Sequence, residues 1–578
     1  MRGTCVSLLA ALLVLTAPAF AAGSGAARTA GEMLYQRGLL DGAPVRARRT
    51  DLGPVEGRAA ACATCHRGSG LGTTEGVLFV PPVTGRALFS DGKDPLVVRV
   101  DRRLNAGVHI ARGGLDLPAF STILREGRRP DGSLLSAVMP RYELDPATVE
   151  SLAAYLWTLS AEVAPGLQDG AINIATVLGP SMDPAGRRAL RATLETYVAQ
   201  RNAALSKRRH LDVSTMERRY AFPRQWRLAF WELEGRPETW PAQLIRYQQA
   251  QPVFALLSGG GGDWAPVEQF CNKAGIACWF PSVDATDAAS RTPLALYFSA
   301  GSQLDARVIE AHLGSRAGTM RRVLVLHDSG TEPRAAVDLL RRRVLAPGAA
   351  LRVLPADASQ LDAALSEVGE DDLVVAWLSP ASAARLARHR PPRAAFYWST
   401  TGEADSGVWP EAWRAKGWRI DPLEREPVRA ANLKRFAQWA AAAKLPLDAP
   451  RLQSEAWFAA RAFETALSDA LGNLHPRYLV ERAQDMLSLH EAERVQQETE
   501  SLMRGMKARR VPLPGLAAGS LALPDLDLLR RRHGTSIYPN LSLGPGQQVA
   551  AKGAYVVPLG APDDAAADWI VPDESPNP

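Results

Sequence analysis

The chain has 578 residues, a hydrophobic fraction of 46% and a formal net charge of +6 at pH 7. This length exceeds what one hydrophobic core supports, so we expect two or three domains. The positive charge comes from arginines scattered among acidic residues rather than gathered in a stripe, which argues against a nucleic-acid partner.

Residues 1–21 are typical of a secretory signal peptide. A basic start at Arg2 precedes a short apolar run, and Ala19-Phe20-Ala21 offers a small-x-small cleavage site. The apolar run is too short to span a bilayer and no later run is long enough, so we expect no membrane span. The sequence therefore predicts a soluble periplasmic protein that is cleaved near Ala21.

The segment Cys62-Ala63-Thr64-Cys65-His66 carries the most specific signal in the chain. Two thiols one helical turn apart can each form a thioether bond to a haem vinyl group, and the adjacent imidazole can then ligate the iron. A disulfide pair beside a bystander histidine is the alternative interpretation. We expect one covalent haem c, attached at Cys62 and Cys65, with His66 as the proximal iron ligand.

A second axial ligand is expected from Met139, which is followed by Pro140 and by a helix from Pro146 to Leu159. A thioether ligand raises the reduction potential and suits an electron carrier. Met33 and His109 are the competing ligands, but Met33 fits a core position and His109 fits a loop. With both axial positions filled, the iron has no open position for a substrate, which favours electron transfer over catalysis.

The segment from Gly31 to Ser160 resembles the class I cytochrome c family, in which a helix, the haem motif, a Met-Pro loop and a final helix follow in this order. The matching pieces are Gly31 to Gly38, Cys62 to His66, Met139 to Tyr142 and Pro146 to Leu159. The resemblance implies an all-α domain over residues 22–162, with His66 and Met139 as axial ligands. It also implies that the Pro82 carbonyl accepts the N–H of His66. From the role of a one-electron carrier, we expect a periplasmic dehydrogenase, cytochrome or oxidase as the redox partner.

After an expected linker at residues 163–170, the pattern changes to short apolar runs that alternate with helical stretches. Such alternation predicts parallel sheets covered on both faces, with two α/β lobes over residues 171–560 and a disordered tail over 561–578. The expected strands are Ile172 to Leu178, Trp226 to Leu233, Pro252 to Ser258, Ile276 to Phe280, Arg322 to His327, Asp372 to Leu378, Ala394 to Tyr397 and Gly553 to Leu559. Long helices are expected at Leu452 to Leu471 and Pro476 to Leu489.

This region resembles the type 1 periplasmic binding proteins, above all the receptors for branched-chain amino acids. The segments that carry the resemblance are Ile172 to Pro180, Leu256 to Gly260, Ile276 to Ser282 and Tyr297 to Gly301. The family binds a small solute between two hinged lobes, and matching by position gives the candidates Ser258, Gly259, Ser282, Ser299, Ser399, Thr400 and Glu403. The glycine run after Ser258 departs from the Ser/Thr-rich segment that these receptors usually have there.

Cys271 and Cys278 lie close in sequence, one late on an expected helix and one on the next strand. In an oxidising compartment a disulfide is the natural interpretation, with two buried thiols as the alternative. No nucleophile elbow, phosphate loop or His-Glu-x-x-His motif is present, so we expect no catalytic residues.

The sequence therefore predicts a multidomain protein: an all-α class I cytochrome c domain followed by a two-lobed α/β domain. The leading hypothesis is a periplasmic monohaem cytochrome that transfers single electrons, with a fused domain that docks a redox partner or senses a small ligand. One alternative is the substrate-binding component of an ABC-type uptake system with the haem as a redox reporter. The other is a non-catalytic electron-transfer subunit of a periplasmic dehydrogenase.

Overall fold

A computed structural model describes residues 25–75, 78–90, 114–168, 170–209, 224–286, 291–328, 332–399, 408–470, 473–488, 536–539, 541–562, 565 and 567–572. The chain divides into two compact units, Met1–Val163 and Ala164–Pro578. Within the described ranges, no helix is both long and apolar enough to cross a membrane. The predicted signal peptide lies outside these ranges.

The first unit is built around the crossing of its first and last helices. Its helices are α1 (Gly25–Arg37), α2 (Ala63–His66), α3 (Gly85–Phe89), α4 (Leu117–Glu126) and α5 (Pro146–Leu156), with a 3₁₀ turn η2 (Gly57–Ala60). Helix α5 starts as its sequence predicts, because the Asp145 side chain accepts the N–H of Thr148 and Pro146 takes the first helical position. Leu34 and Tyr35 of α1 pack with Leu152 of α5 in one buried cluster.

The first unit is not all-α, so that expectation is wrong. Its strands are β1 (Leu39–Leu40), β2 (Ala43–Pro44), β3 (Arg46–Arg49), β4 (Gly53–Glu56), β5 (Thr73–Glu75), β6 (Leu78–Val80) and β7 (Arg141–Tyr142). They form the antiparallel arrangements β1-β2, β4-β3-β7 and β5-β6. Strands of two to four residues leave too short an alternation of apolar and polar side chains to be recognised in sequence.

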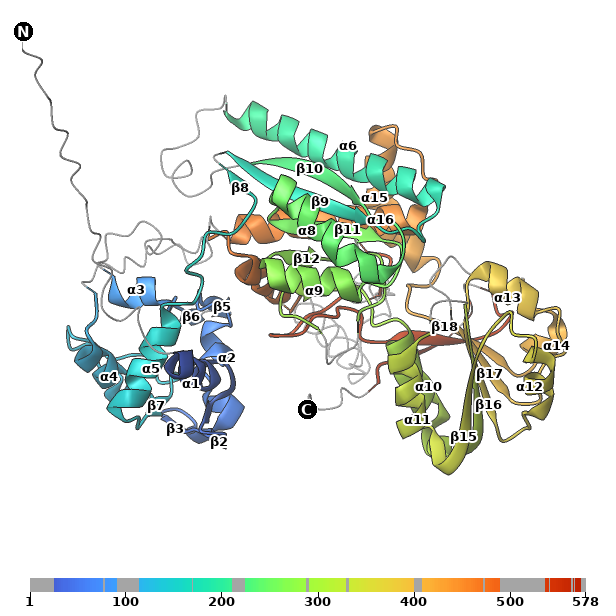
Figure 1. Ribbon diagram of the computed structural model, residues 1–578, viewed down its shortest axis with the longest axis horizontal. Coiled ribbons are helices and arrows are strands. Elements are labelled where there is room, and N and C mark those ends of the chain that lie inside the picture. The colour runs from blue at the N-terminus through green and yellow to red at the C-terminus, as the bar shows by residue number, and fades with distance from the viewer. Residues whose placement is uncertain are drawn as a thin grey trace, which may run out of the picture. The chain divides into compact units, whose positions relative to one another are not determined.

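The second unit contains two sheets. In the first, the strands β10-β9-β11-β12-β13 are parallel in this order and β8 is antiparallel to β9; Figure 1 labels β8 to β12 of this sheet. Its elements are β8 (Leu167–Gln168), β9 (Ala171–Leu178), α6 (Pro184–Arg209), β10 (Gln225–Glu232), η4 (Pro237–Thr239), α8 (Trp240–Ala250), β11 (Ala255–Gly260), α9 (Ala265–Ala274), β12 (Ala277–Trp279) and β13 (Ala295–Leu296). The side chains of alternate residues in β9 point to opposite faces of the sheet. Ile172 and Ile174 pack toward α6, whereas Ala175 and Val177 pack toward α8 and α9. Both faces of this sheet are therefore covered.

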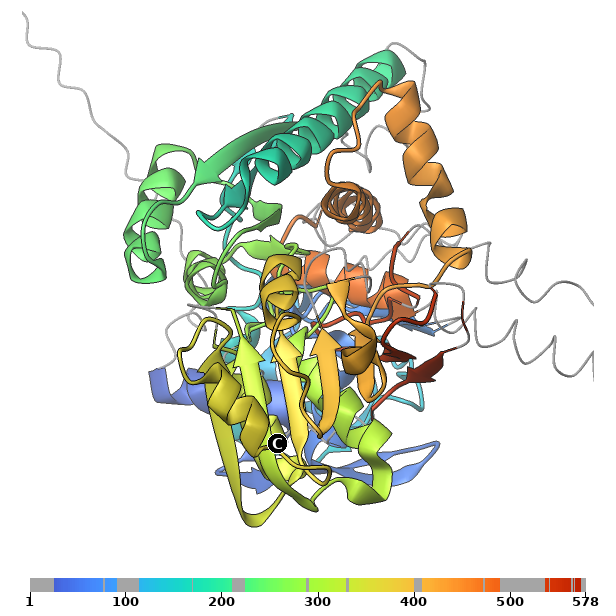
Figure 2. The ribbon, with the colours of Figure 1, turned by 90° about the vertical axis from the view of Figure 1, so that its right-hand side faces the viewer.

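The second sheet has the order β15-β14-β16-β17-β18-β19-β20, in which β14 to β18 are parallel and the last two strands antiparallel. Its elements are α10 (Ser302–Leu313), η5 (Gly314–Arg316), β14 (Met320–His327), α11 (Arg334–Arg343), β15 (Leu345–Pro355), α12 (Leu361–Glu367), β16 (Leu373–Trp377), α13 (Pro380–Leu386), β17 (Ala395–Ser399), α14 (Glu411–Arg414), β18 (Gly417–Asp421), β19 (Ala554–Pro558) and β20 (Asp568–Ile570). One face packs on α10 and α11 and the other on α12 and α13 (Figure 2). The expected two-lobed α/β architecture is confirmed by these two sheets.

Between the two sheets the chain returns to the first lobe. Helices α15 (Val428–Ala442) and α16 (Pro450–Asp469) and a helical segment over 476–488 pack with α6 and β9 in the core of the first lobe. Within the described ranges the chain passes between the lobes after β13, after β18 and before β19. The second lobe is therefore completed by the last strands of the chain.

Two expected boundaries are corrected. The expected linker at 163–170 belongs in large part to the first lobe, because Ala164 lies in its core and β8 pairs with β9. The expected disordered tail at 561–578 contains β20, which pairs with β19 and packs Trp569 against Tyr555. Both segments are rich in Pro, Gly or Asp, but a neighbouring strand supplies the hydrogen bonds that fix them.

Candidate functional site

The motif Cys62 to His66 folds as a single helical turn. The His66 N–H donates to the Cys62 carbonyl at 2.9 Å, so that Cys62, which precedes α2 as its N-cap, lies on the same helical turn as Cys65 and His66. Neither thiol belongs to a disulfide, and Cys65 is exposed whereas Cys62 is half-buried. Burial raises the pKa of Cys62 to about 12, so this thiol is protonated at neutral pH. The interpretation of the motif as a disulfide is wrong, because the two sulfurs are not joined.

The imidazole of His66 is oriented by Pro81, and the prediction of Pro82 is wrong by one residue. The His66 Nδ1 atom lies 2.9 Å from the Pro81 carbonyl oxygen. The hairpin β5-β6 pairs Thr73 with Val80, which places Pro81 at its end, and Gly72 permits the approach because a Cβ there would lie 2.1 Å from the Val80 oxygen. This register could not be predicted from the sequence.

The donor set at α2 fits a covalently attached haem. With Nδ1 held by a carbonyl, Nε2 is the ring nitrogen left for a metal, and burial lowers the pKa of His66, which favours the neutral imidazole. Met139 is half-buried and packs against the same hydrophobic cluster as Cys62. The competing ligand His109 lies outside the described residues.

In the second unit, the predicted residues of the first lobe meet at the carboxyl ends of β11 and β12. The Ser282 N–H donates to the Gly259 carbonyl at 2.8 Å. The hydroxyl oxygens of Ser258 and Ser282 are buried and have no hydrogen-bond partner among the described residues. Ser258 also has a left-handed backbone, with φ of 55°, and only 1% of it is exposed. A strained residue with an unpaired buried hydroxyl costs stability and is characteristic of binding sites.

The glycine run after Ser258 serves close packing of two loops. A Cβ at Gly259 would lie 2.5 Å from the Val177 oxygen, and one at Gly261 would lie 2.7 Å from the Gly179 oxygen. The Gly260 carbonyl accepts the N–H of Gly179 at 2.7 Å. These glycines therefore bring β9 and β11 together at the edge where the serines lie.

The second lobe contributes a buried carboxyl group that the sequence analysis missed. Asp305, in the first turn of α10, accepts hydrogen bonds from Ser399 and from the indole nitrogen of Trp377. Burial raises its pKa to about 7, and the negative charges of Asp284 and Asp421 act in the same direction. An acidic residue in an amphipathic helix normally predicts an exposed position, so the sequence held no signal for this site.

Of the remaining ligand-binding candidates, Ser299 has a structural role, and Thr400 and Glu403 lie outside the described residues. The Ser299 hydroxyl accepts the N–H of Gly301 at 3.0 Å and its carbonyl accepts the N–H of Ala285. Ser299 thus fixes the entry into α10. Thr400 and Glu403 belong to the segment 400–407, which the structure does not describe.

The predicted disulfide is confirmed. Cys271 near the end of α9 is bonded to Cys278 on β12, with the two Cα atoms 6.0 Å apart. Both residues are buried in the cluster that packs α8 and α9 on the sheet. The bond therefore joins a helix to the strand that follows it.

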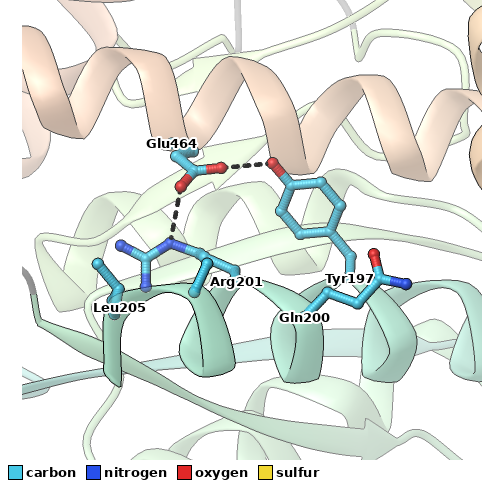
Figure 3. A pocket seen from close by; sticks show the side chains of 6 residues that line it. Tyr197, Gln200, Arg201, Leu205 and Glu464 are labelled. Atoms are coloured by element: carbon cyan, nitrogen blue, oxygen red, sulfur yellow. Dashed lines mark hydrogen bonds and ion pairs between the residues drawn. The ribbon is translucent and has the colours of Figure 1, made fainter. Parts of the chain in front are cut away.

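A surface cavity of about 270 Å³ lies elsewhere, between α6 and α16 (Figure 3). Its lining residues are Tyr197, Gln200, Arg201, Ala204, Leu205 and Glu464. The Tyr197 hydroxyl donates to Glu464 at 2.6 Å, and Arg201 pairs with the other oxygen of the same carboxylate at 3.2 Å. The Tyr197 hydroxyl and the Arg201 guanidinium group are thus both directed at one carboxylate in this cavity.

Comparisons with known proteins give weak similarities to solved structures. No family model and no curated protein matches the chain. A possible leucine/isoleucine/valine-binding protein from Rhodopirellula baltica SH 1 is 10% identical, with 69% of this chain and 96% of that chain covered and a TM-score of 0.43. A leucine-binding protein from Thermotoga maritima MSB8 is 11% identical (69% and 97% covered, TM-score 0.41), and a fatty acid ABC transporter substrate-binding protein from Thermomonospora curvata is 13% identical (71% and 94% covered, TM-score 0.40).

Proposed function

We propose that the first unit is a periplasmic electron carrier with one covalent haem c. The observation that carries this proposal is the donor set at α2: two thiols outside any disulfide and an imidazole on one helical turn, with the imidazole oriented by the Pro81 carbonyl. Such a group supplies one-electron redox chemistry when it is bound. Cys62 and Cys65 would attach it, and His66 and Met139 would ligate its iron.

The residues around the motif support an electron carrier because they hold the ligands rather than open a substrate site. The Pro81 carbonyl fixes the ring orientation and increases the basicity of His66. Met139 would supply a thioether as the second protein ligand, which would raise the reduction potential. A periplasmic dehydrogenase, cytochrome or oxidase would be the partner for electron exchange.

The test is maturation of the full chain in a host with haem-attachment machinery. Wild type should gain the mass of one haem, and a Cys62→Ala/Cys65→Ala variant should gain none. The oxidised protein should show a near-infrared sulfur-to-iron band that disappears in Met139→Ala and persists in the matched variant Met33→Ala. A wild type without covalent haem would contradict the proposal, and a high-spin spectrum would indicate an open iron position instead.

A second function, for the second unit, is capture of a small solute as in an ABC-type uptake system. The buried, unpaired Ser258 hydroxyl in one lobe and the buried Asp305 carboxyl in the other support it. The similar structures named above are described as binding proteins for branched-chain amino acids and fatty acids, which favours this function for the second unit. The solute would accept a hydrogen bond from Ser258 and present a donor to Asp305.

Solute capture is tested by thermal unfolding of the full chain with leucine, isoleucine, valine and a medium-chain fatty acid. A solute that binds only the folded protein raises the unfolding temperature, and the shift grows with the logarithm of the solute concentration above its Kd. Ser258→Ala should abolish this shift, whereas Ser366→Ala, on the exposed face of α12, should not. The proposal fails for these solutes if none shifts the wild-type transition.

A further inference from the structure

Arg141 makes an unusual set of hydrogen bonds in the first unit. Its guanidinium group donates to the Met139 carbonyl at 2.6 Å, to the Ser136 carbonyl at 3.3 Å and to the Leu135 carbonyl at 3.4 Å. These three carbonyls belong to the loop that ends at Met139. Because neighbouring strand residues point to opposite sides, Tyr142 faces the core while Arg141 faces this loop.

The space for the guanidinium group is provided by Gly127 at the end of α4. A Cβ at this position would lie 2.1 Å from Cζ and from Nε of Arg141, and 2.3 Å from Nη2. The Gly127 carbonyl also accepts the N–H of Leu135 at 2.8 Å. The end of α4, the side chain of Arg141 and the loop at 135–139 are thus fastened to one another.

We infer that Arg141, with Gly127, is a positioning device that holds the Met139 thioether in its ligand position; this inference rests on the proposed function. A guanidinium group is planar and rigid and can donate from both sides of its fork, whereas a lysine ammonium is a single point of donation. Hydrogen bonds from a charged donor are the stronger ones in proteins. Lysine at position 141 therefore keeps the charge but loses the simultaneous hold on Met139 and Leu135.

The test uses the matured full chain and the binding of exogenous imidazole to the oxidised iron, in competition with Met139. Because imidazole binds only when the thioether is detached, its apparent affinity reports the detached fraction. We expect Arg141→Lys and Gly127→Ala each to bind imidazole about tenfold more tightly than wild type, since charge-assisted hydrogen bonds are lost. The near-infrared sulfur-to-iron band should weaken in parallel.

Two matched controls isolate the effect. Gly132→Ala introduces the same left-handed strain in the same loop, with φ of 82° against 67° at Gly127, but no atom lies within 4 Å of its Cβ. Arg125→Gln removes an exposed guanidinium group that is paired only with Glu126 at 3.7 Å among the described ion pairs. Both variants should bind imidazole as wild type does.

The outcomes separate this inference from the proposed function. A wild type that lacks the near-infrared band would overturn the ligation by Met139 and the positioning role with it. A wild type that has the band, with unchanged imidazole affinity in Arg141→Lys and Gly127→Ala, would overturn the positioning role alone. Equal effects of Gly127→Ala and Gly132→Ala would assign the Gly127 result to backbone strain and would also contradict it.

Discussion

The indole Nε1 atom of Trp377 lies 3.0 Å from the Oδ2 atom of Asp305 and donates a hydrogen bond to it from β16 to α10. A second hydrogen bond comes from Ser399 at the end of β17. Both bonds stabilise the ionised carboxylate, yet burial, Asp284 and Asp421 prevail and raise the pKa to about 7. The protonation state of this residue therefore changes near neutral pH.

The first prediction concerns the pH dependence of stability. An unfolded aspartate ionises near pH ~3.9, so between about pH 4 and pH 7 the folded protein binds more protons and its free energy of unfolding falls as pH rises. In Asp305→Asn this contribution is absent. The free energy of unfolding can be measured by urea unfolding at pH 5 and at pH 8. Between these two pH values, we expect that of wild type to fall by about 2 to 3 kcal/mol more than that of the variant.

Asp338→Asn is the control for that experiment, because Asp338 is an exposed residue of α11 that pairs with Arg341. Its unfolding free energy should follow wild type at both pH values. A difference between wild type and Asp305→Asn that does not change with pH would show that Asp305 titrates normally in the folded chain.

The second prediction concerns the crossing of α1 and α5. A Cβ at Gly31 would lie 2.2 Å from the Ser151 carbonyl oxygen and 2.9 Å from Cβ of Tyr155, so Gly31→Ala must separate the helices. Overpacking of this kind costs about 1 to 3 kcal/mol. In hydrogen exchange followed by mass spectrometry, amides of α1 and α5 should exchange about tenfold faster or more.

Glu32→Ala places an alanine on the exposed side of the same helix and should leave exchange in α1 and α5 at the wild-type rate. If the amides of α1 and α5 exchange at the wild-type rate in Gly31→Ala as well, the two helices do not pack as closely as the 2.2 Å between a Cβ at Gly31 and the Ser151 oxygen requires.

The third prediction concerns the disulfide between Cys271 and Cys278, which are separated by seven positions. A loop of this length restricts the unfolded chain only modestly, so the Cys271→Ala/Cys278→Ala variant should lose about 2 to 3 kcal/mol. Urea unfolding of the second unit measures this loss. Under reducing conditions wild type should converge on the variant, whereas an identical wild-type curve with and without reductant would contradict the stabilising role.

The fourth prediction concerns Ser258, whose positive φ and unpaired hydroxyl both cost stability. Ser258→Gly relieves both, so we expect a gain of about 1 kcal/mol in the free energy of unfolding together with loss of any solute-induced shift. Ser302→Gly, at the start of α10, should give no gain. A loss of stability in Ser258→Gly would mean that the hydroxyl has a partner in the folded protein.

Much of the second unit could be predicted because its central strands are buried on both faces. All eight residues of β9 are buried, and this produces a continuous apolar run. The strand β15 was missed since most of its residues are only half-buried and it contains Pro347 and Gly348. The strand β18 was missed because Arg419 and Asp421, which pair at 3.5 Å, interrupt its apolar pattern.

The candidate haem site likewise contains residues that could be predicted from the sequence and residues that could not. The haem motif could be predicted because its spacing is local and its chemistry depends on five consecutive residues. Pro81 and Arg141 could not, since their roles depend on the register of the hairpin β5-β6 and on the free space above Gly127. Long-range geometry decides these contacts, and the sequence pattern contains no trace of it.

The late return of the chain to the second lobe has a consequence for biosynthesis. Strand β18 ends at Asp421, and its neighbour β19 begins only at Ala554. While the chain is emerging into the compartment where it folds, the β18 edge therefore exposes unpaired backbone groups until more than a hundred further residues have followed. A nascent chain in this state is a substrate for chaperones, and premature termination before Ala554 would leave a lobe that cannot close its sheet.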